Sequence, residues 1–326
     1  MTILETAQQL AREVLFPAAI DTDRATVLPV AVLDALADAG LYGLTGPATA
    51  GGAGAYFATV CEVVEALSSG CLTTAFVWTQ HIGAVNAAAA SENLAIEEWV
   101  APLCTGRRRA GLTLGGAVPG PPALRARKAG DGWDFFGTAP FVSGWTRIDV
   151  MHTAARTDDG RLVWALVDAV ESDSLSVDRL ELVAINATNT VRAEFRDHHV
   201  AGDRVTSVVP YREEPTPPEV MRIHASFALG VLARCRELLG PTPLDTEVSR
   251  LREELDRLDP ETIQDARGAV GELALRASAA LLVSTGSRSL LLSEHAQRLA
   301  REALFVLVYA LRPGSRAAAL DRLGAC

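Results

Sequence analysis

The sequence predicts an α+β protein of three parts: an N-terminal helical domain, a central antiparallel β domain and a C-terminal helical bundle. Apolar residues repeat at helical spacing over residues 1–108, and the same periodicity returns over 212–326. Between them, over 109–211, short apolar runs alternate with turn signals. The 326 residues are 49% hydrophobic and 21% charged, which excludes a disordered chain and allows a sizeable core.

The first part is predicted to be helical throughout. Its apolar repeat runs from Leu4 to Leu15, and we expect Phe16-Pro17 to end that helix. A second helix is expected over 30–39, followed by a Gly/Pro-rich connection at 43–54. The remaining predicted helices of this part cover residues 55–68, 71–90 and 92–103.

The central part is predicted to consist of strands joined by tight turns. Gly130-Asp131-Gly132 and Asp158-Asp159-Gly160 have the composition of hairpin turns. Because the connections are short, we expect the strands to be mostly antiparallel.

The C-terminal part follows a proline-rich linker, REEPTPPEV, at 212–220. Helical periodicity then continues to the end, which predicts a bundle. The predicted helices cover residues 222–239, 244–258, 261–283 and 294–311.

The net charge and the spacing of the cysteines exclude several kinds of partner and site. The chain has 30 Lys and Arg against 40 Asp and Glu, a net charge of −10, so nucleic acid and anionic membrane are excluded as partners. Five scattered cysteines without a Cys-x-x-Cys pair indicate a cytoplasmic protein with no metal site. Residues 66–91 carry no charge, but their many polar groups predict a helix buried in protein rather than a membrane span.

Several strings resemble the acyl-CoA dehydrogenase family. The opening VLFPAAIDTDRATVLPVAVLDALADAGLYGLTGPATAGGAG resembles the family's opening nearly phrase by phrase. In the β domain, GWDFFGTAPFVSG is similar to the hairpin that precedes the flavin, and NATNTVRAEFRDHHVAGDRV is similar to the last β segment. Near the C-terminus, AQRLAREALFVLVYALRPGS resembles the family's last conserved helix and the Tyr that follows it. These matches are collinear over nearly the whole chain and imply the family's fold.

The resemblance implies an FAD-dependent enzyme that acts on the CH–CH bond of an acyl thioester. FAD requires hydrogen-bond donors at its pyrimidine edge and at N5. Leu112 and Thr113, in GLTLGG, hold the place of the family's flavin-contacting turn, and Ser143 holds the hydroxyl position of a second triplet. Phe141 replaces an aromatic residue that flanks the ring, and Gly116 is expected to let the backbone approach the pyrophosphate. Ordinary strand and turn roles are the alternative for all five.

The usual catalytic base is missing from this pattern. In most members a Glu directly follows the Tyr of the C-terminal segment, whereas here Ala310 follows Tyr309. Some relatives supply the base just before an Arg in the first helix after the β domain, but Met221 precedes Arg222 here. An alanine cannot abstract a proton, so Glu219 is the candidate substitute base.

His81 is the second candidate catalytic residue. It follows Trp78 in the uncharged stretch FVWTQHIGAV. A buried neutral histidine with one hydrogen-bond partner is the first interpretation. The second comes from flavin monooxygenases of the same fold, which lack the catalytic Glu; some carry a Phe-x-Ser-Gly string like residues 141–144 and a His near the flavin.

Three function classes therefore stay open: an FAD-dependent acyl thioester oxidoreductase, a flavin-dependent monooxygenase, and a non-catalytic subunit that completes a partner's site. The substrate is expected to be an acyl thioester or another small organic molecule. The family's Arg-x-x-Phe-Gly segment, which holds the pyrophosphate of a neighbouring subunit's FAD, has no clean counterpart. Long uncharged helices and the family's usual interface predict a homodimer or homotetramer, with a hetero-oligomer as the alternative.

Overall fold

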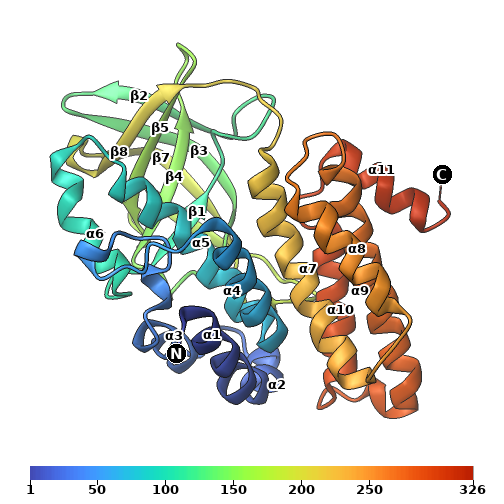
Figure 1. The fold of residues 1–326 in the computed structure, drawn as a ribbon. Coiled ribbons are helices and arrows are strands. Elements are labelled where there is room, and N and C mark those ends of the chain that lie inside the picture. Colours follow the sequence, from blue (N-terminus) through green and yellow to red (C-terminus); the bar gives the residue numbers. More distant parts are fainter. Residues whose placement is uncertain (326) are drawn as a thin grey trace.

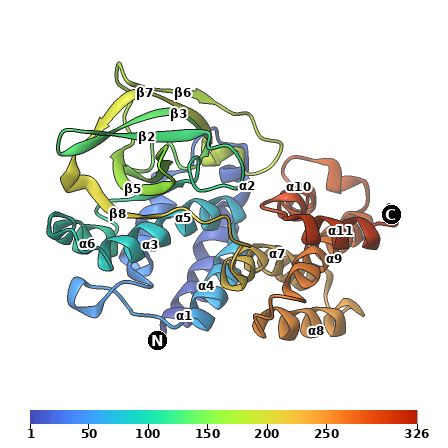
Figure 2. The ribbon, with the colours of Figure 1, turned by 90° about the horizontal axis from the view of Figure 1, so that it is seen from above.

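The computed structural model describes residues 1–325 and has the predicted order of helices, sheet and helices (Figure 1). The sheet lies above the N-terminal helices, and the C-terminal bundle stands to one side of both. Seen from above, the bundle remains beside the sheet rather than beneath it (Figure 2).

The N-terminal helices largely match the prediction. A capping box between Thr2 and Glu5 begins the first helix. The expectation that Phe16-Pro17 ends it is wrong, because a π-helical segment, Ala11–Leu15, carries the helix on and Pro17 lies in the first turn of the next one, where its missing N–H costs little. The helices are α1 (Ile3–Leu10), α2 (Phe16–Arg24), α3 (Val30–Asp38), α4 (Phe57–Gly70), α5 (Leu72–Ala89) and α6 (Glu97–Cys104).

The central sheet has the strand order β6-β7-β3-β2-β4-β5-β8, with β1 paired to β4. Both predicted hairpin turns are confirmed, between β2 and β3 and between β4 and β5. Most pairs are antiparallel as predicted, but β1 pairs with β4 in parallel because the β2–β3 hairpin separates them in sequence. The strands are β1 (Ala110–Thr113), β2 (Leu124–Ala129), β3 (Gly132–Val142), β4 (Val150–Arg156), β5 (Arg161–Asp168), β6 (Leu175–Arg179), β7 (Val191–Val200) and β8 (Val205–Pro210).

The C-terminal bundle begins four residues earlier than predicted, with Pro218 in the first turn of its first helix. Its last helix was not predicted. The expected helix over 294–311 stops at Val308, because Ala310 adopts a left-handed conformation with φ of 52°. The helices are α7 (Pro218–Leu239), α8 (Leu244–Asp256), α9 (Ile263–Thr285), α10 (His295–Val308) and α11 (Pro313–Arg322).

The N-terminal and C-terminal helices share one hydrophobic core. α7 crosses α4 so closely that a Cβ on Gly230 would lie 2.4 Å from the Ser68 Cβ and 2.5 Å from the Glu65 carbonyl oxygen. An ion pair of 2.9 Å between Arg222 and Glu65 spans the same crossing. α5 is buried, as the sequence predicts, and no helix within residues 1–325 combines the length and hydropathy needed to cross a bilayer.

Candidate functional site

A cleft of about 250 Å³ lies between the β domain and the C-terminal bundle. One wall is the loop after β1, and the other is formed by the linker before α7 and by the turn between α10 and α11. The linker that crosses from β8 to α7 is visible at the top of Figure 1. The cleft is lined by Leu114, Ala117, Val118, Pro119, residues 211–217, Val220 and Arg312.

Thr113 ends β1 directly before the cleft-lining Leu114. Its side chain is buried, and its hydroxyl has no hydrogen-bond partner. A buried hydroxyl without a partner is unfavourable, so this atom is suited to meet a bound ligand. Leu112 is half-buried in the same strand, where it pairs with His152 of β4.

Ser143 follows β3 and belongs to a chain of three hydroxyls. Its Oγ lies 2.8 Å from the Thr190 Oγ1, which lies 2.7 Å from the Thr188 Oγ1. Because a hydroxyl has one donor and two acceptor positions, Ser143 keeps capacity for another partner. Phe141, on the same strand, is 65% exposed and so offers an aromatic surface to a ligand.

Gly116 has a packing role that its predicted role did not include. A Cβ at this position would lie 2.6 Å from the Arg156 amide nitrogen. Its own N–H donates to the Ala154 carbonyl at 2.8 Å, and the next two amides, of Ala117 and Val118, donate to the Leu114 carbonyl. These amides are used within the protein, so they do not support the predicted approach to a pyrophosphate.

Arg156 holds the loop after β1 in place through hydrogen bonds, and the sequence did not predict this contact. Its guanidinium donates to the carbonyls of Gly116, Val118 and Gly120 at 2.6–2.9 Å and lies 3.4 Å from the centre of the Tyr211 ring. A stretch of alternating β residues gives no local signal for such a contact, because its partners come from a separate loop and from the linker.

His81 uses both ring nitrogens inside the protein. Its Nε2 donates to the Leu103 carbonyl at 3.1 Å, and its Nδ1 accepts from the Ala110 N–H at 2.9 Å. Burial lowers the pKa of His81 to about 4, so the ring is neutral. This geometry favours the structural interpretation and leaves no ring nitrogen for a flavin hydroperoxide.

The segment in which the resemblance places the family's base ends in an aromatic cluster. The Tyr309 ring lies 5.1 Å from each of the rings of Phe76, Phe305 and His224. Burial raises the pKa of Tyr309 to about 12. Ala310 follows in the left-handed turn, where its side chain cannot take a proton.

Glu219 is exposed in the first turn of α7 and does not line the cleft. Within residues 1–325 the carboxylates that line it are Glu213 and Glu214 of the linker. The sequence argument missed both, because it searched only positions where relatives place their base.

Two arginines flank the turn after α10, and neither was a predicted site residue. Arg267 of α9 is buried and donates from Nη2 to the carbonyls of Val306 and Tyr309 at 2.8 and 2.9 Å. Arg312 lines the cleft and donates from Nε to the Thr216 hydroxyl at 2.7 Å.

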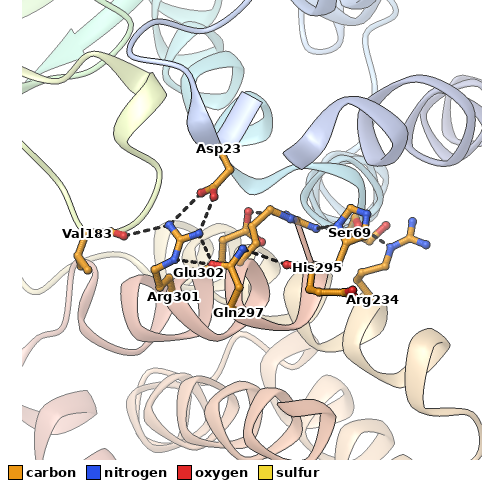
Figure 3. Close-up of polar contacts among 10 residues, drawn as sticks. Asp23, Ser69, Val183, Arg234, His295, Gln297, Arg301 and Glu302 are labelled. Carbon is orange, nitrogen blue, oxygen red and sulfur yellow. Dashed lines mark hydrogen bonds and ion pairs between the residues drawn. The ribbon is translucent and has the colours of Figure 1, made fainter. Parts of the chain in front are cut away.

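A second polar cluster, which we call the junction cluster, joins α10 to the N-terminal helices (Figure 3). It contains the ion pairs Arg298–Glu302 at 2.6 Å and Arg301–Asp23 at 2.5 Å. Burial raises the pKa of Glu302, so its charge depends on Arg298. The cluster also includes Arg234, which donates to the Ser69 carbonyl at 2.8 Å, while Figure 3 shows Arg301 between Asp23 and Val183.

Comparison with known proteins identifies the family. Residues 1–107 match the model "Acyl-CoA dehydrogenase, N-terminal domain". The chain is 26% identical over 297 residues to the 3-sulfinopropanoyl-CoA desulfinase of Paraburkholderia xenovorans (strain LB400), covering 86% of this chain and 74% of that protein. These matches support a member of the acyl-CoA dehydrogenase family. It is also 23% identical over 215 residues to the mitochondrial short-chain specific acyl-CoA dehydrogenase of Homo sapiens.

That second match covers 62% of this chain and 52% of the human protein, so the chain aligns with about half the length of this relative. Solved structures of the family share the fold over nearly the whole chain. A glutaryl-CoA dehydrogenase from Mycobacterium smegmatis in complex with FADH2 has a TM-score of 0.79 at 16% identity, over 99% of this chain and 94% of that one. The methanesulfinate monooxygenase MsuC from Pseudomonas fluorescens has a TM-score of 0.75 at 19% identity, over 100% and 98%.

The described residues fit FAD in one place and not in another. Thr113, directly before the cleft-lining Leu114, has an unpartnered hydroxyl, and Phe141 of β3 has an exposed ring; both groups suit a flavin ring. In the loop after β1, the amides of Gly116, Ala117 and Val118 are already paired and do not suit a pyrophosphate.

Proposed function

We propose that this chain is a flavin-dependent oxidoreductase that acts on acyl thioesters and lacks a base at position 310. The observation that carries the proposal is the buried Thr113 hydroxyl, which has no partner within the described chain and precedes the cleft by one residue. Membership of the acyl-CoA dehydrogenase family supports it, since homologous members are FAD-dependent.

FAD, when bound, supplies the acceptor for a hydride from the carbon β to the thioester. Thr113 and Ser143 would hold the polar edge of the ring through their hydroxyls, and Phe141 would cover its apolar part. Thr188 and Thr190 fix the Ser143 hydroxyl through the hydroxyl chain. These groups hold and orient the cofactor without taking a proton.

Proton abstraction is the step for which this chain is least equipped. A positioned general base contributes about 10²–10⁴-fold to rate, and Ala310 supplies none. We therefore expect saturated acyl thioesters to reduce the bound flavin slowly. Anaerobic stopped-flow absorbance measures this rate, and a gain on Ala310→Glu would support an inherited pocket that has lost only its base.

Flavin binding by the full chain tests the proposal. Thr113→Val removes one hydrogen bond and should weaken FAD binding about tenfold. Thr74→Val is the matched control, because the Thr74 hydroxyl is also buried and unpartnered but lies in α5. A folded protein that binds no FAD, or equal losses in both variants, would contradict the proposal.

A second candidate is a non-catalytic subunit that completes a partner's site. Two observations favour it: Ala310 stands at the base position, and the loop amides near Gly116 are already paired. The same titration separates the candidates, since a folded chain without FAD affinity supports the subunit. The monooxygenase candidate loses support because both nitrogens of His81 are used within the protein.

We also propose a cytoplasmic, self-associating protein. Cys61, Cys71, Cys104 and Cys235 are all buried and unpaired, which suits a reducing compartment. Exposed apolar side chains on α10, Leu304 and Val308, suit an interface with another chain.

A further inference from the structure

The turn after α10 carries two guanidinium groups without a counter-charge. Within residues 1–325, neither Arg267 nor Arg312 lies within 4.0 Å of a carboxylate oxygen. The Nε and Nη1 atoms of Arg267 are buried without any hydrogen-bond partner. Arg312 uses only Nε, on the Thr216 hydroxyl, and directs no other nitrogen to a protein acceptor in the described chain.

The charge of Arg267 is buried, which is unfavourable for the protein alone, whereas Arg312 is half-buried. A buried charge is tolerated when it is paired and hydrogen-bonded, and its desolvation is uncompensated otherwise. Glu213 and Glu214 line the same cleft as Arg312, yet neither pairs with it. His224 adds no charge here, because burial and the two arginines lower its pKa to about 3 and keep it neutral.

The turn therefore differs in charge from the site that the family's usual chemistry needs, while the cleft beside it is lined by two arginines, Arg212 and Arg312, and two glutamates, Glu213 and Glu214. A proton-abstracting site requires a carboxylate next to Tyr309, whereas this turn holds two cations and an alanine. The planar guanidinium is suited to a flat anion with two oxygens, which it can bind through parallel N–H donors. Arg312 is the group that reaches the cleft, and Arg267 is the group that holds the carbonyls of the turn.

We propose that Arg312 binds a second anionic group of the substrate, a carboxylate or an equivalent two-oxygen anion on the acyl chain. Arg267 is the positioning residue, since it fixes the turn through Val306 and Tyr309 and adds positive charge beneath it. This inference rests on the proposed action on acyl thioesters and names their class. The substrates are acyl thioesters that carry a negative charge on the acyl part.

The phosphates of coenzyme A are another source of anionic oxygen, so the test uses thioesters without them. Isothermal titration calorimetry compares glutaryl-pantetheine with pentanoyl-pantetheine, which have five acyl carbons each and differ in the terminal carboxylate. The wild-type chain should bind the glutaryl ester about tenfold to 100-fold more tightly, the range for a hydrogen-bonded charge pair. Arg312→Gln should abolish the preference, and Arg312→Lys should keep part of it.

Arg316→Gln is the matched control, because Arg316 lies in the same segment, is exposed and does not line the cleft. It should leave the preference unchanged. For Arg267→Met, a purely structural role would weaken both esters alike, whereas a positioning role lowers the ratio of their affinities. Arg267→Lys, which keeps the charge, should restore part of that ratio.

Equal binding of the two pantetheine esters by the wild type would overturn this inference and leave the proposed function standing. Failure of both esters to bind would overturn the inference together with the proposed acyl thioester substrate. The coenzyme A esters form the last arm. If Arg312→Gln weakens glutaryl-CoA and pentanoyl-CoA equally and leaves both pantetheine esters unchanged, Arg312 binds phosphate and the inference is wrong.

Discussion

The junction cluster and the turn after α10 use the same residue type in opposite ways. In the junction cluster, Arg298 and Arg301 each have a carboxylate within 2.6 Å, from Glu302 and Asp23. In the turn, Arg267 is buried as deeply but has only backbone carbonyls as partners. Glu302 of the junction cluster and Val306, whose carbonyl accepts from Arg267 of α9, lie about one turn apart on α10.

The two regions show that buried arginines of this chain differ in counter-charge: Arg298 is paired with a carboxylate, whereas Arg267 has only backbone carbonyls as partners. Removing one partner of a buried pair leaves a bare charge and is strongly destabilising. Arg267 has no carboxylate partner in the described chain. Substitution by an apolar side chain of similar size therefore removes the cost of burying its charge as well as its two hydrogen bonds. The two regions should therefore respond differently to substitution.

The largest effect is expected at the junction cluster. Glu302→Gln leaves Arg298 only 1% exposed and without a carboxylate, so the free energy of unfolding should fall by about 3–5 kcal/mol. Denaturant unfolding followed by tryptophan fluorescence measures it. Glu294→Gln, which breaks the exposed pair with Arg288, is the control and should cost less than about 1 kcal/mol. Equal losses would remove the distinction between the pairs.

His81 is buried as a neutral ring and needs no counter-charge, so it should make the stability of the chain depend on pH. The pKa of His81 is about 4 in the folded chain and 6.5 without burial, so the unfolded chain binds the extra proton between these values. The free energy of unfolding should therefore decrease as the pH falls below 6.5, by about 2 kcal/mol from His81 between pH 7 and pH 5. Unfolding of wild type and His81→Gln at both pH values measures this share, and identical pH dependence would contradict it.

Arg267→Met should affect stability far less than the substitution in the junction cluster. It removes two hydrogen bonds to carbonyls but also a buried charge without a partner, so the expected loss is about 1 kcal/mol. Arg298→Met is the matched substitution and should cost about 3–5 kcal/mol because Glu302 is left unpaired. If both variants lose the same amount in denaturant unfolding, Arg267 is as much a structural residue as Arg298.

The smallest effect on stability is expected on the outer face of α10. Val308 is 64% exposed, so Val308→Asp should change the free energy of unfolding by less than about 0.5 kcal/mol. If this face is an interface, the same variant should shift sedimentation toward a smaller species. Leu94→Asp, at another exposed apolar side chain, is the control and should leave the assembly unchanged. A wild-type monomer at micromolar concentration would contradict the interface.

The sequence predicted the fold well where local signals determine it. Both hairpins and most helices follow from turn residues and from hydrophobic periodicity, which depend on neighbours in the chain. The continuation of the first helix past Phe16-Pro17 was not predictable in this way, because it depends on a π-helical segment against which Gly70 packs closely. The parallel pairing of β1 with β4 likewise depends on contacts between distant residues.

The candidate site was less predictable. Thr113, Ser143 and Phe141 were named from a resemblance, and their roles stay predictions. The contacts of Arg156 with the loop and with Tyr211 were not predicted, and neither was the lack of a carboxylate partner for Arg267. Both depend on which distant groups contact the arginine. The residues next to an arginine in the sequence do not predict whether it has a carboxylate partner in the fold.

The crossing of α4 and α7 imposes an order on biosynthesis. Glu65 meets Arg222 only after another 157 residues have been added, and the whole β domain is made in between. At ribosomal speeds of about 5–20 residues per second, the surface of α4 around Glu65 and Ser68 waits roughly 8–30 s for its partner helix. During that interval the nascent chain presents an apolar helix face with an unpaired carboxylate at its centre. Ribosome-associated chaperones should therefore engage chains that end before residue 218 and release them once α7 has emerged.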